Sequence, residues 1–278
     1  MCPQAEPSAA GGEVVNKAVT TMGQALRSQV AQSSPLRTYQ DLVIGSRAWG
    51  DLLRYELIAA WGSVLPGAVG LVVRKWLWPK LFAHVGRGAV WGRNVVVWHP
   101  GKMWIGDGVV VDDECYLDAK GCNPGEFRID DGALISRGCI ISGKDGPLVI
   151  GARTNVGAGC TLYASTRLEI GADTILAADC YIGGGRYDSH GRIDIPLSQQ
   201  PLPRRGVVVE SDCWLGAGVV VVDGVHIGRG SVIGAGAVVT CDVAPYSIAA
   251  GVPARLVGRR IADVCPREIE CQPPSGIA

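Results

Sequence analysis

The sequence lacks an excess of charge of either sign and is poor in aromatic residues. Its 278 residues carry 26 basic and 26 acidic side chains, and 6% of them are aromatic. Proteins that bind nucleic acids usually carry a strong positive charge that neutralises phosphates. We therefore expect no nucleic-acid partner.

Cysteine is too sparse for a disulfide-stabilised scaffold. Ten cysteines are spread over the chain, whereas disulfide scaffolds are short secreted domains with a far higher cysteine density. The first residues, MCPQAEPSAAGGEVVNK, contain no basic cluster followed by an apolar run, so a secretory signal is not expected. These features predict a reduced, cytoplasmic protein.

Glycine, in contrast, is abundant. The chain has 39 glycines and 16 prolines, although its 47% of hydrophobic residues is ordinary for a folded protein. Many glycines in a well-packed chain indicate many tight corners, as in a repeat protein.

An apolar residue returns every six positions from residue 85 onward, usually followed by glycine, and the fifth position of each hexad is mostly small. This period is typical of a parallel β-helix, in which each hexad forms one short strand and one corner. The hexads begin at Val85, Trp91, Val97, Ile105, Val111, Leu117, Ile129, Ile135, Ile141, Ile150, Val156, Leu162, Ile170, Leu176, Ile182, Val209, Leu215, Val221, Ile227, Ile233 and Val239. The fold class is therefore all-β.

Insertions interrupt the period only after every third hexad. Three hexads follow one another without interruption from Val209 to Ile227, whereas extra residues follow the third hexad between Ile105 and Ile129. If three hexads complete one turn of a triangular prism, all insertions lie along one edge of it. Loops gathered on one edge of a rigid scaffold usually carry function. We expect the active site there, where the longest insertion, residues 183–208, protrudes.

Several stretches of the sequence resemble one known family. The long loop with its histidine, the stretch CWLG at 213–216 and the ending APYSIAAGVPARLVGR at 244–259 resemble the hexapeptide-repeat acyltransferases. The likeness is greatest to the maltose, galactoside and colanic-acid O-acetyltransferases, and it covers about residues 85–260. It implies a left-handed β-helix and a homotrimer with active sites between subunits. It also implies transfer of an acyl group, expected to be acetyl, from coenzyme A (CoA) to a hydroxyl.

Acyl transfer to a hydroxyl needs a base that takes the hydroxyl proton, and histidine suits this task with its unperturbed pKa near ~6.5. His190 lies in the longest loop, ahead of Trp214 in the chain, a placement similar to that of the family's catalytic histidine. We expect His190 to be the general base and Asp188 to orient its ring, with Asp194 as the alternative. The family's frequent His-Pro pair is His190-Gly191 here.

The other histidines are weaker candidates. His226 lies in a regular hexad and should face solvent, and His84 precedes the first turn. His99 lies in an insertion, where it is either a substrate contact or a polar loop residue. A γ-class carbonic anhydrase shares this fold but holds its metal with three histidines. We expect no metal here.

The resemblance also implies residues that bind the two substrates. Two positions depart from the family's donor site, because Cys241 and Gly258 stand where lysine and arginine are common. The expected CoA-binding residues are Ala217, Ala235, Thr240, Arg255 and Trp214. The insertions should shape the acceptor pocket through Asp118, Asn123, Lys144 and Asp145.

The region before the repeats has a different composition. Residues 1–84 contain Trp49, Trp61, Trp76 and Trp78, which is half of the eight tryptophans. The uncharged run 57–73 is interrupted by Pro66, and it is short for a membrane span. Two interpretations of residues 41–82 stay open. These residues either cap the first turn or lie in a membrane interface, which would place the protein at the inner face of the membrane.

The chain is thus divided into a helical extension (1–84), a β-helix (85–244) and a C-terminal segment with a short helix and a tail (245–278). We expect an acyltransferase acting on a sugar, a glycolipid or a small natural product. One alternative uses a long-chain acyl-CoA or an acyl carrier protein, because the apolar extension could shelter a chain. The other is a non-catalytic trimeric scaffold.

Overall fold

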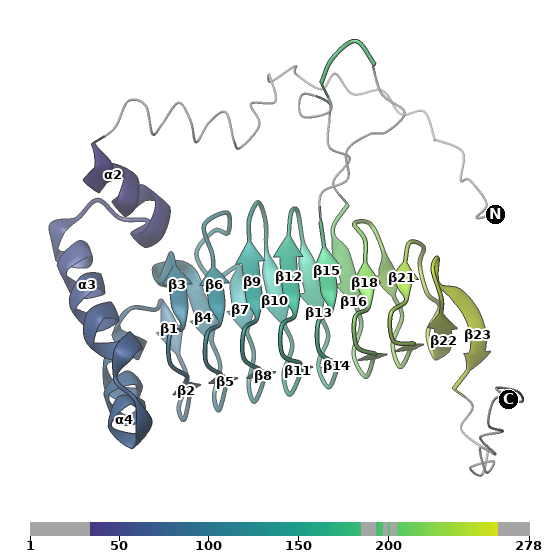
Figure 1. Ribbon diagram of the computed structural model, residues 1–278, viewed down its shortest axis with the longest axis horizontal. Helices are drawn as coiled ribbons and strands as arrows, with labels where there is room; N and C mark the ends of the chain where they lie inside the picture. The colour runs from purple at the N-terminus through teal and green to yellow at the C-terminus, as the bar shows by residue number, and fades with distance from the viewer. Residues whose placement is uncertain (1–33, 185–192, 197–199, 201–204, 261–278) are drawn as a thin grey trace, which may run out of the picture.

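The computed structural model describes residues 34–184, 193–196, 200 and 205–260. Helices form one end of an elongated molecule, and a stack of short strands forms the rest (Figure 1). The short helix and tail expected after residue 260 lie outside the described residues. The helices, in chain order, are α2 (Pro35–Tyr39), η1 (Gln40–Ile44), α3 (Trp49–Val64), α4 (Gly67–Leu77) and η2 (Trp78–Lys80), and a further short helix, η3 (Pro100–Lys102), follows within the stack of strands.

Pro66 separates α3 from α4, because a proline has no backbone N–H and here adopts an extended conformation with ψ of 165°. The apolar run that the sequence places at 57–73 is therefore split between two helices. Among the described residues no helix is both long and apolar enough to cross a membrane.

The strands form three sheets, which confirms the predicted parallel β-helix. Sheet A contains β1 (His84–Val85), β4 (Met103–Ile105), β7 (Phe127–Ile129), β10 (Leu148–Ile150), β13 (Leu168–Ile170), β16 (Val207–Val209) and β19 (His226–Ile227). Sheet B contains β2 (Val90–Trp91), β5 (Val110–Val111), β8 (Leu134–Ile135), β11 (Asn155–Val156), β14 (Ile175–Leu176), β17 (Trp214–Leu215), β20 (Val232–Ile233), β22 (Ser247–Ala250) and β23 (Arg255–Arg259). Sheet C contains β3 (Val96–Trp98), β6 (Tyr116–Asp118), β9 (Ile140–Gly143), β12 (Thr161–Ala164), β15 (Tyr181–Gly183), β18 (Val220–Val221) and β21 (Val238–Val239).

The apolar hexad residues stack inside the prism. Ile129 aligns with Ile105 before it and Ile150 after it, and all three are fully buried. Because successive residues of a strand point to opposite faces, the residue before each of these faces outward. The six-residue period therefore places one apolar side chain of every strand in the core.

Four cysteines occupy the predicted small position where sheet B passes into sheet C. Cys115, Cys139, Cys160 and Cys180 are all buried. Each thiol lies against a backbone carbonyl of the following turn, as Cys139 Sγ does 3.1 Å from Gly157 O. The ladder packs the corner, as a small apolar side chain should.

All insertions fall between a strand of sheet C and the next strand of sheet A, as predicted. We call this corner the rim, and it includes residues 99–102, 119–126, 144–147 and the described ends of 183–208. The corner between sheets B and C carries no insertion in the described turns and is called the B–C corner below.

The helices close the first turn through side chains. Trp78 packs on Trp91, and the two ring centroids are 5.2 Å apart. The guanidinium of Arg74 donates to Trp91 O at 2.8 Å, and Tyr55 Oη donates to Val97 O at 2.9 Å. These carbonyls belong to the first turn, so no preceding turn can supply their donors.

Candidate functional site

The predicted catalytic residues His190 and Asp188 lie outside the described residues. The described ends of their loop are fixed at the rim. On one side Ser165 Oγ donates to Gly184 O, and on the other the backbone N–H groups of Arg205 and Gly206 donate to the carboxylate of Asp223 at 3.1 and 3.0 Å. The loop therefore leaves and rejoins the β-helix at the predicted edge.

His99 lies in the first insertion and is buried there. Its side chain packs over Gly45, and the residue is only 4% exposed. Its Nε2 lies 3.1 Å from Asp41 O, and its backbone N–H donates to Val43 O at 2.7 Å. Burial lowers the pKa of His99 to about 4, so the ring is neutral at pH 7. The residues that bury it belong to the helical extension, far earlier in the chain, where no local pattern points to them.

Asp118 lies beside His99, with Oδ1 3.9 Å from the histidine Nδ1. It accepts a hydrogen bond from Lys120 N at 2.8 Å, and Tyr116 Oη lies 3.4 Å from its Oδ2. Burial raises the pKa of the Asp118 carboxyl. Of the four predicted acceptor residues, all of which the structure describes, Asp118 alone is buried.

The other predicted acceptor residues are on neighbouring insertions. Asn123 Nδ2 donates to Glu126 Oε1 at 2.9 Å, which closes a turn at the surface. The Lys144 ammonium lies 5.4 Å from the ring centroid of Tyr163, and Asp145 next to it is exposed. The insertions 119–126 and 144–147 are adjacent, because Gly121 N donates to Gly143 O, immediately before the second insertion, at 2.9 Å. The insertions thus bring these residues to one edge.

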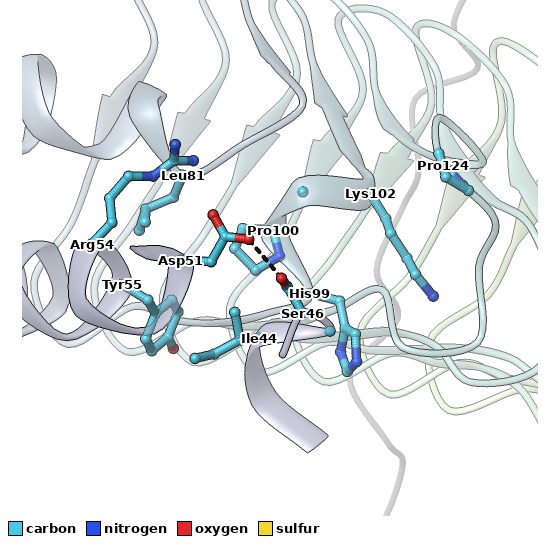
Figure 2. Close-up of a pocket in the computed structure, with 12 residues that line it drawn as sticks. Ile44, Ser46, Asp51, Arg54, Tyr55, Leu81, His99, Pro100, Lys102 and Pro124 are labelled. Atoms are coloured by element: carbon cyan, nitrogen blue, oxygen red, sulfur yellow. Dashed lines mark hydrogen bonds between the residues drawn. The ribbon is translucent and has the colours of Figure 1, made fainter. Parts of the chain in front are cut away.

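A cavity of about 280 Å³ opens between the helical layer and the first insertions (Figure 2). Its polar lining includes Asp51, Arg54 and Lys102, while the four predicted acceptor residues lie outside it. Asp51 accepts from Ser46 Oγ at 2.6 Å, and Lys102 Nζ donates to Lys120 O at 2.7 Å. Sequence reasoning missed this cavity, because α3 supplies part of its polar lining from a position far before the insertion.

The predicted donor residues occupy two corners. Ala217 and Ala235 lie on successive turns at the B–C corner, where Gly236 N donates to Ala217 O at 2.8 Å. Thr240 lies across sheet C, where the chain leaves β21 at the rim. Trp214 projects outward from sheet B and is 54% exposed. Thr240 and the two alanines therefore lie at opposite ends of the strands of sheet C.

Arg255, the fifth of these residues, lines a separate cavity of about 230 Å³ at the C-terminal end of the β-helix. Arg259, Cys241 and Asp242 also line it. Neither arginine forms an ion pair within the described part of the chain, so both guanidinium groups can meet an anion. The phosphates of CoA fit this chemistry.

Comparison with known proteins supports the repeat and finds relatives that are named as acetyltransferases. The model of the bacterial transferase hexapeptide (six repeats) matches residues 206–241. The "Probable acetyltransferase" of Mycobacterium tuberculosis is 34% identical over 123 residues, which are 43% of this chain and 40% of that protein. A galactoside O-acetyltransferase of Lactococcus lactis is 37% identical over 115 residues, 39% of this chain and 55% of that protein.

The chain thus spans about half the length, or less, of these two curated relatives. Among solved structures, an N-acyltransferase from Bacillus cereus in complex with dTDP and CoA aligns with a TM-score of 0.45 and 19% identity, covering 65% of this chain and 85% of that one. Residues 206–241 thus match the hexapeptide-repeat model, and the curated proteins to which part of the chain is similar are named as acetyltransferases.

Proposed function

We propose that this protein transfers an acetyl group from acetyl-CoA to a hydroxyl of a sugar, a glycolipid or a small natural product. The observation that carries the proposal is the position of the matched repeat. It begins at residue 206, where the loop of His190 rejoins the β-helix, and it ends at residue 241 in the arginine-lined cavity. Both curated relatives are named as acetyltransferases, and the name of the second one gives a galactoside as the acceptor.

In the proposed reaction His190 takes the proton of the acceptor hydroxyl, and the freed oxygen attacks the thioester carbonyl. The tetrahedral intermediate then collapses, the C–S bond breaks, and the CoA sulfur takes the proton from the histidine. Asp188 holds the imidazole in the tautomer that can accept a proton. The products are an acetyl ester and free CoA, and no metal takes part.

Arg255 and Arg259, at the C-terminal end of the β-helix, would bind the phosphates of CoA, and Thr240 precedes Cys241, which lines the same cavity. Backbone groups at Ala217 and Ala235, with Trp214, would contact the rest of the molecule. Ala217 and Thr240 lie at opposite ends of the strands of sheet C, and Arg255 lies on β23 of sheet B. We propose that CoA extends over these positions in a groove between two subunits. A site shared by subunits is what the resemblance implies.

The outer faces of the sheets support a homotrimer. Sheet B carries exposed Ile175 and Trp214 outward, and sheet C carries exposed Ile140 and Tyr181. Sheet A instead projects polar residues such as His226, whose Nε2 lies 2.9 Å from Glu210 Oε1. Exposed apolar ladders on two of three faces suit contacts between copies. We propose that sheets B and C form the subunit contacts.

The acceptor would lie along the rim, near Asp118, Asn123, Lys144 and Asp145. These side chains offer carboxylates, an amide and an ammonium, which are the groups that hydrogen-bond to a hydroxyl-rich molecule. The proposed acceptor is therefore polar at the end that reacts.

The test uses the purified full chain and a donor panel of acetyl-CoA, a long-chain acyl-CoA and an acyl carrier protein thioester. Thiol release and calorimetric binding are measured for the natural chain, His190→Ala and the control His226→Ala. We expect acetyl-CoA to be preferred and only His190→Ala to lose turnover, by at least about a hundredfold. Preference for a long chain or a carrier protein would replace the proposed donor. Failure of every donor to bind would leave a scaffold, and full activity of His190→Ala would overturn the assignment of the base.

A further inference from the structure

The two helices that close the first turn each have a buried side and an exposed apolar side. The buried side packs on the β-helix through Tyr55 and Ile58 of α3 and through Arg74 of α4. The opposite side of each helix carries an apolar stripe that the described chain leaves uncovered. This outer face consists of Trp49, Leu53 and Leu57 of α3 and Val69, Val72 and Trp76 of α4.

The outer face is unusually exposed for its composition. Trp49 and Trp76 are 71% and 70% exposed, and Val69 is 67% exposed. Its residues recur at intervals of three and four, so on each helix they form one continuous stripe. A contiguous exposed apolar patch marks a surface that another molecule or a membrane covers.

Figure 1 places α3 and α4 beyond the first turn, at the end of the prism opposite β23. The outer face therefore does not compete with sheets B and C for subunit contacts. At 16 and 11 residues the helices are about 24 and 16 Å long. Helices of this length cannot span a bilayer, but they can lie flat in its interface.

The charges around the outer face favour an anionic occupant. Lys75 and Lys80 are exposed, and neither forms an ion pair with another described residue. Glu56, an exposed acid of α3, accepts a hydrogen bond from Tyr39 Oη. Stacking two copies through this face would bring the lysines of α4 and η2 from both copies to one interface, where Glu56 is the exposed acid that α3 supplies. A surface of anionic headgroups would pair with them instead.

We propose that the outer face of α3 and α4 docks this protein on an anionic membrane surface. Trp49 and Trp76 insert at the level of the headgroups, where tryptophan is favoured, and the basic side chains contact lipid phosphates. The docking does not depend on the proposed transferase activity. Where both hold, a lipid-linked acceptor would be presented to the rim.

The test is co-sedimentation of the full chain with vesicles of phosphatidylcholine alone or mixed with phosphatidylglycerol. The variant Trp49→Ser/Trp76→Ser removes the two aromatic anchors. The matched control Val252→Ser/Val257→Ser removes two side chains that are 71% and 64% exposed at the opposite end of the prism. Circular dichroism confirms that each variant is folded.

We expect the natural chain and the control to bind mixed vesicles and the tryptophan variant to bind at least about tenfold more weakly. Lys75→Glu/Lys80→Glu should also reduce binding, and high salt should weaken binding of the natural chain. Equal binding of the tryptophan variant and the control, or no vesicle binding by the natural chain, would overturn the proposal. A tryptophan variant that lowers the oligomeric mass in the absence of lipid would also overturn it and would assign the face to a second copy.

Discussion

The two ends of the β-helix are closed in different ways. At the N-terminal end, helices cover the first turn and supply donors to its carbonyls from side chains, such as Arg74 to Trp91 O. At the C-terminal end, β23 pairs antiparallel with β22, so backbone groups meet backbone groups. The helical closure depends on a few buried side chains, whereas the strand closure leaves its own side chains free for other contacts. Substitutions at the N-terminal end should therefore mainly lower the stability of the protein. Substitutions at the C-terminal end should mainly weaken ligand binding.

The largest expected effect is on stability at the N-terminal end. Trp91→Ala should lower the free energy of unfolding by about 3–5 kcal/mol, because Trp91 is 1% exposed and packs against Trp78 and Phe82. Trp76→Ala, the control with an exposed indole, should change it by less than about 0.5 kcal/mol. Urea unfolding followed by circular dichroism measures both. Equal losses in the two variants would show that the helical layer is not anchored through Trp91.

The next effect concerns pH at the same end. The pKa of His99 is about 4 in the folded protein, against about 6.5 when unfolded, so the unfolded chain binds the extra proton between these values. Stability should be complete above about pH 6.5 and should fall by about 3 kcal/mol as the pH drops toward about 4. His99→Gln should remove this dependence, as urea unfolding at neutral pH and at about pH 4.5 would show.

Other titratable groups near His99 also affect how the stability depends on pH. The raised pKa of Asp118 has the opposite sign, since its contribution is present at low pH and lost as the pH rises. Lys102 and Lys120 add positive charge near the ring and disfavour its protonation. The difference between the natural chain and His99→Gln isolates the histidine. A difference that does not change with pH would mean that His99 is accessible to water in the native protein.

The smallest of these effects is expected at the C-terminal end. Arg255→Ala/Arg259→Ala should weaken CoA binding about tenfold, because two guanidinium groups that can meet phosphates are lost. The same variant should unfold within about 0.5 kcal/mol of the natural chain, since both side chains are exposed. Calorimetry with CoA and urea unfolding give the two values. If the double variant lost stability but bound CoA as the natural chain does, the C-terminal end would serve stability rather than binding, contrary to the proposed contrast.

Sequence reasoning succeeded where the period itself decides the structure. The register of Ile105, Ile129 and Ile150 follows from counting, because a strand of fixed length returns to the same face every turn. The common edge of the insertions follows from the same count. Sequence reasoning did not predict the burial of His99, which depends on Gly45 and Asp41 from another element. It also did not predict β23, because an antiparallel closing strand carries no hexad pattern.

For the candidate site, too, the sequence predicted some features and not others. Sequence places Asp118 and Lys144 at the rim, since both lie where a strand of sheet C ends, but does not show that Asp118 is buried beside His99. A resemblance assigns Ala217 and Thr240 to one donor, yet the fold sets them on either side of sheet C. The resemblance alone therefore did not show how far apart these positions lie on the β-helix.

The sequence by itself determined the six-residue period, the three faces of the prism and the edge at which loops protrude. These features repeat locally, so each follows from short-range alternation of apolar, small and glycine residues. Tertiary structure decided how the helical layer docks, which face of α3 and α4 stays exposed, and which side chains line the cavities. Those features depend on contacts between segments far apart in the sequence, such as Tyr55 with Val97 and Gly45 with His99, and no repeating pattern encodes them.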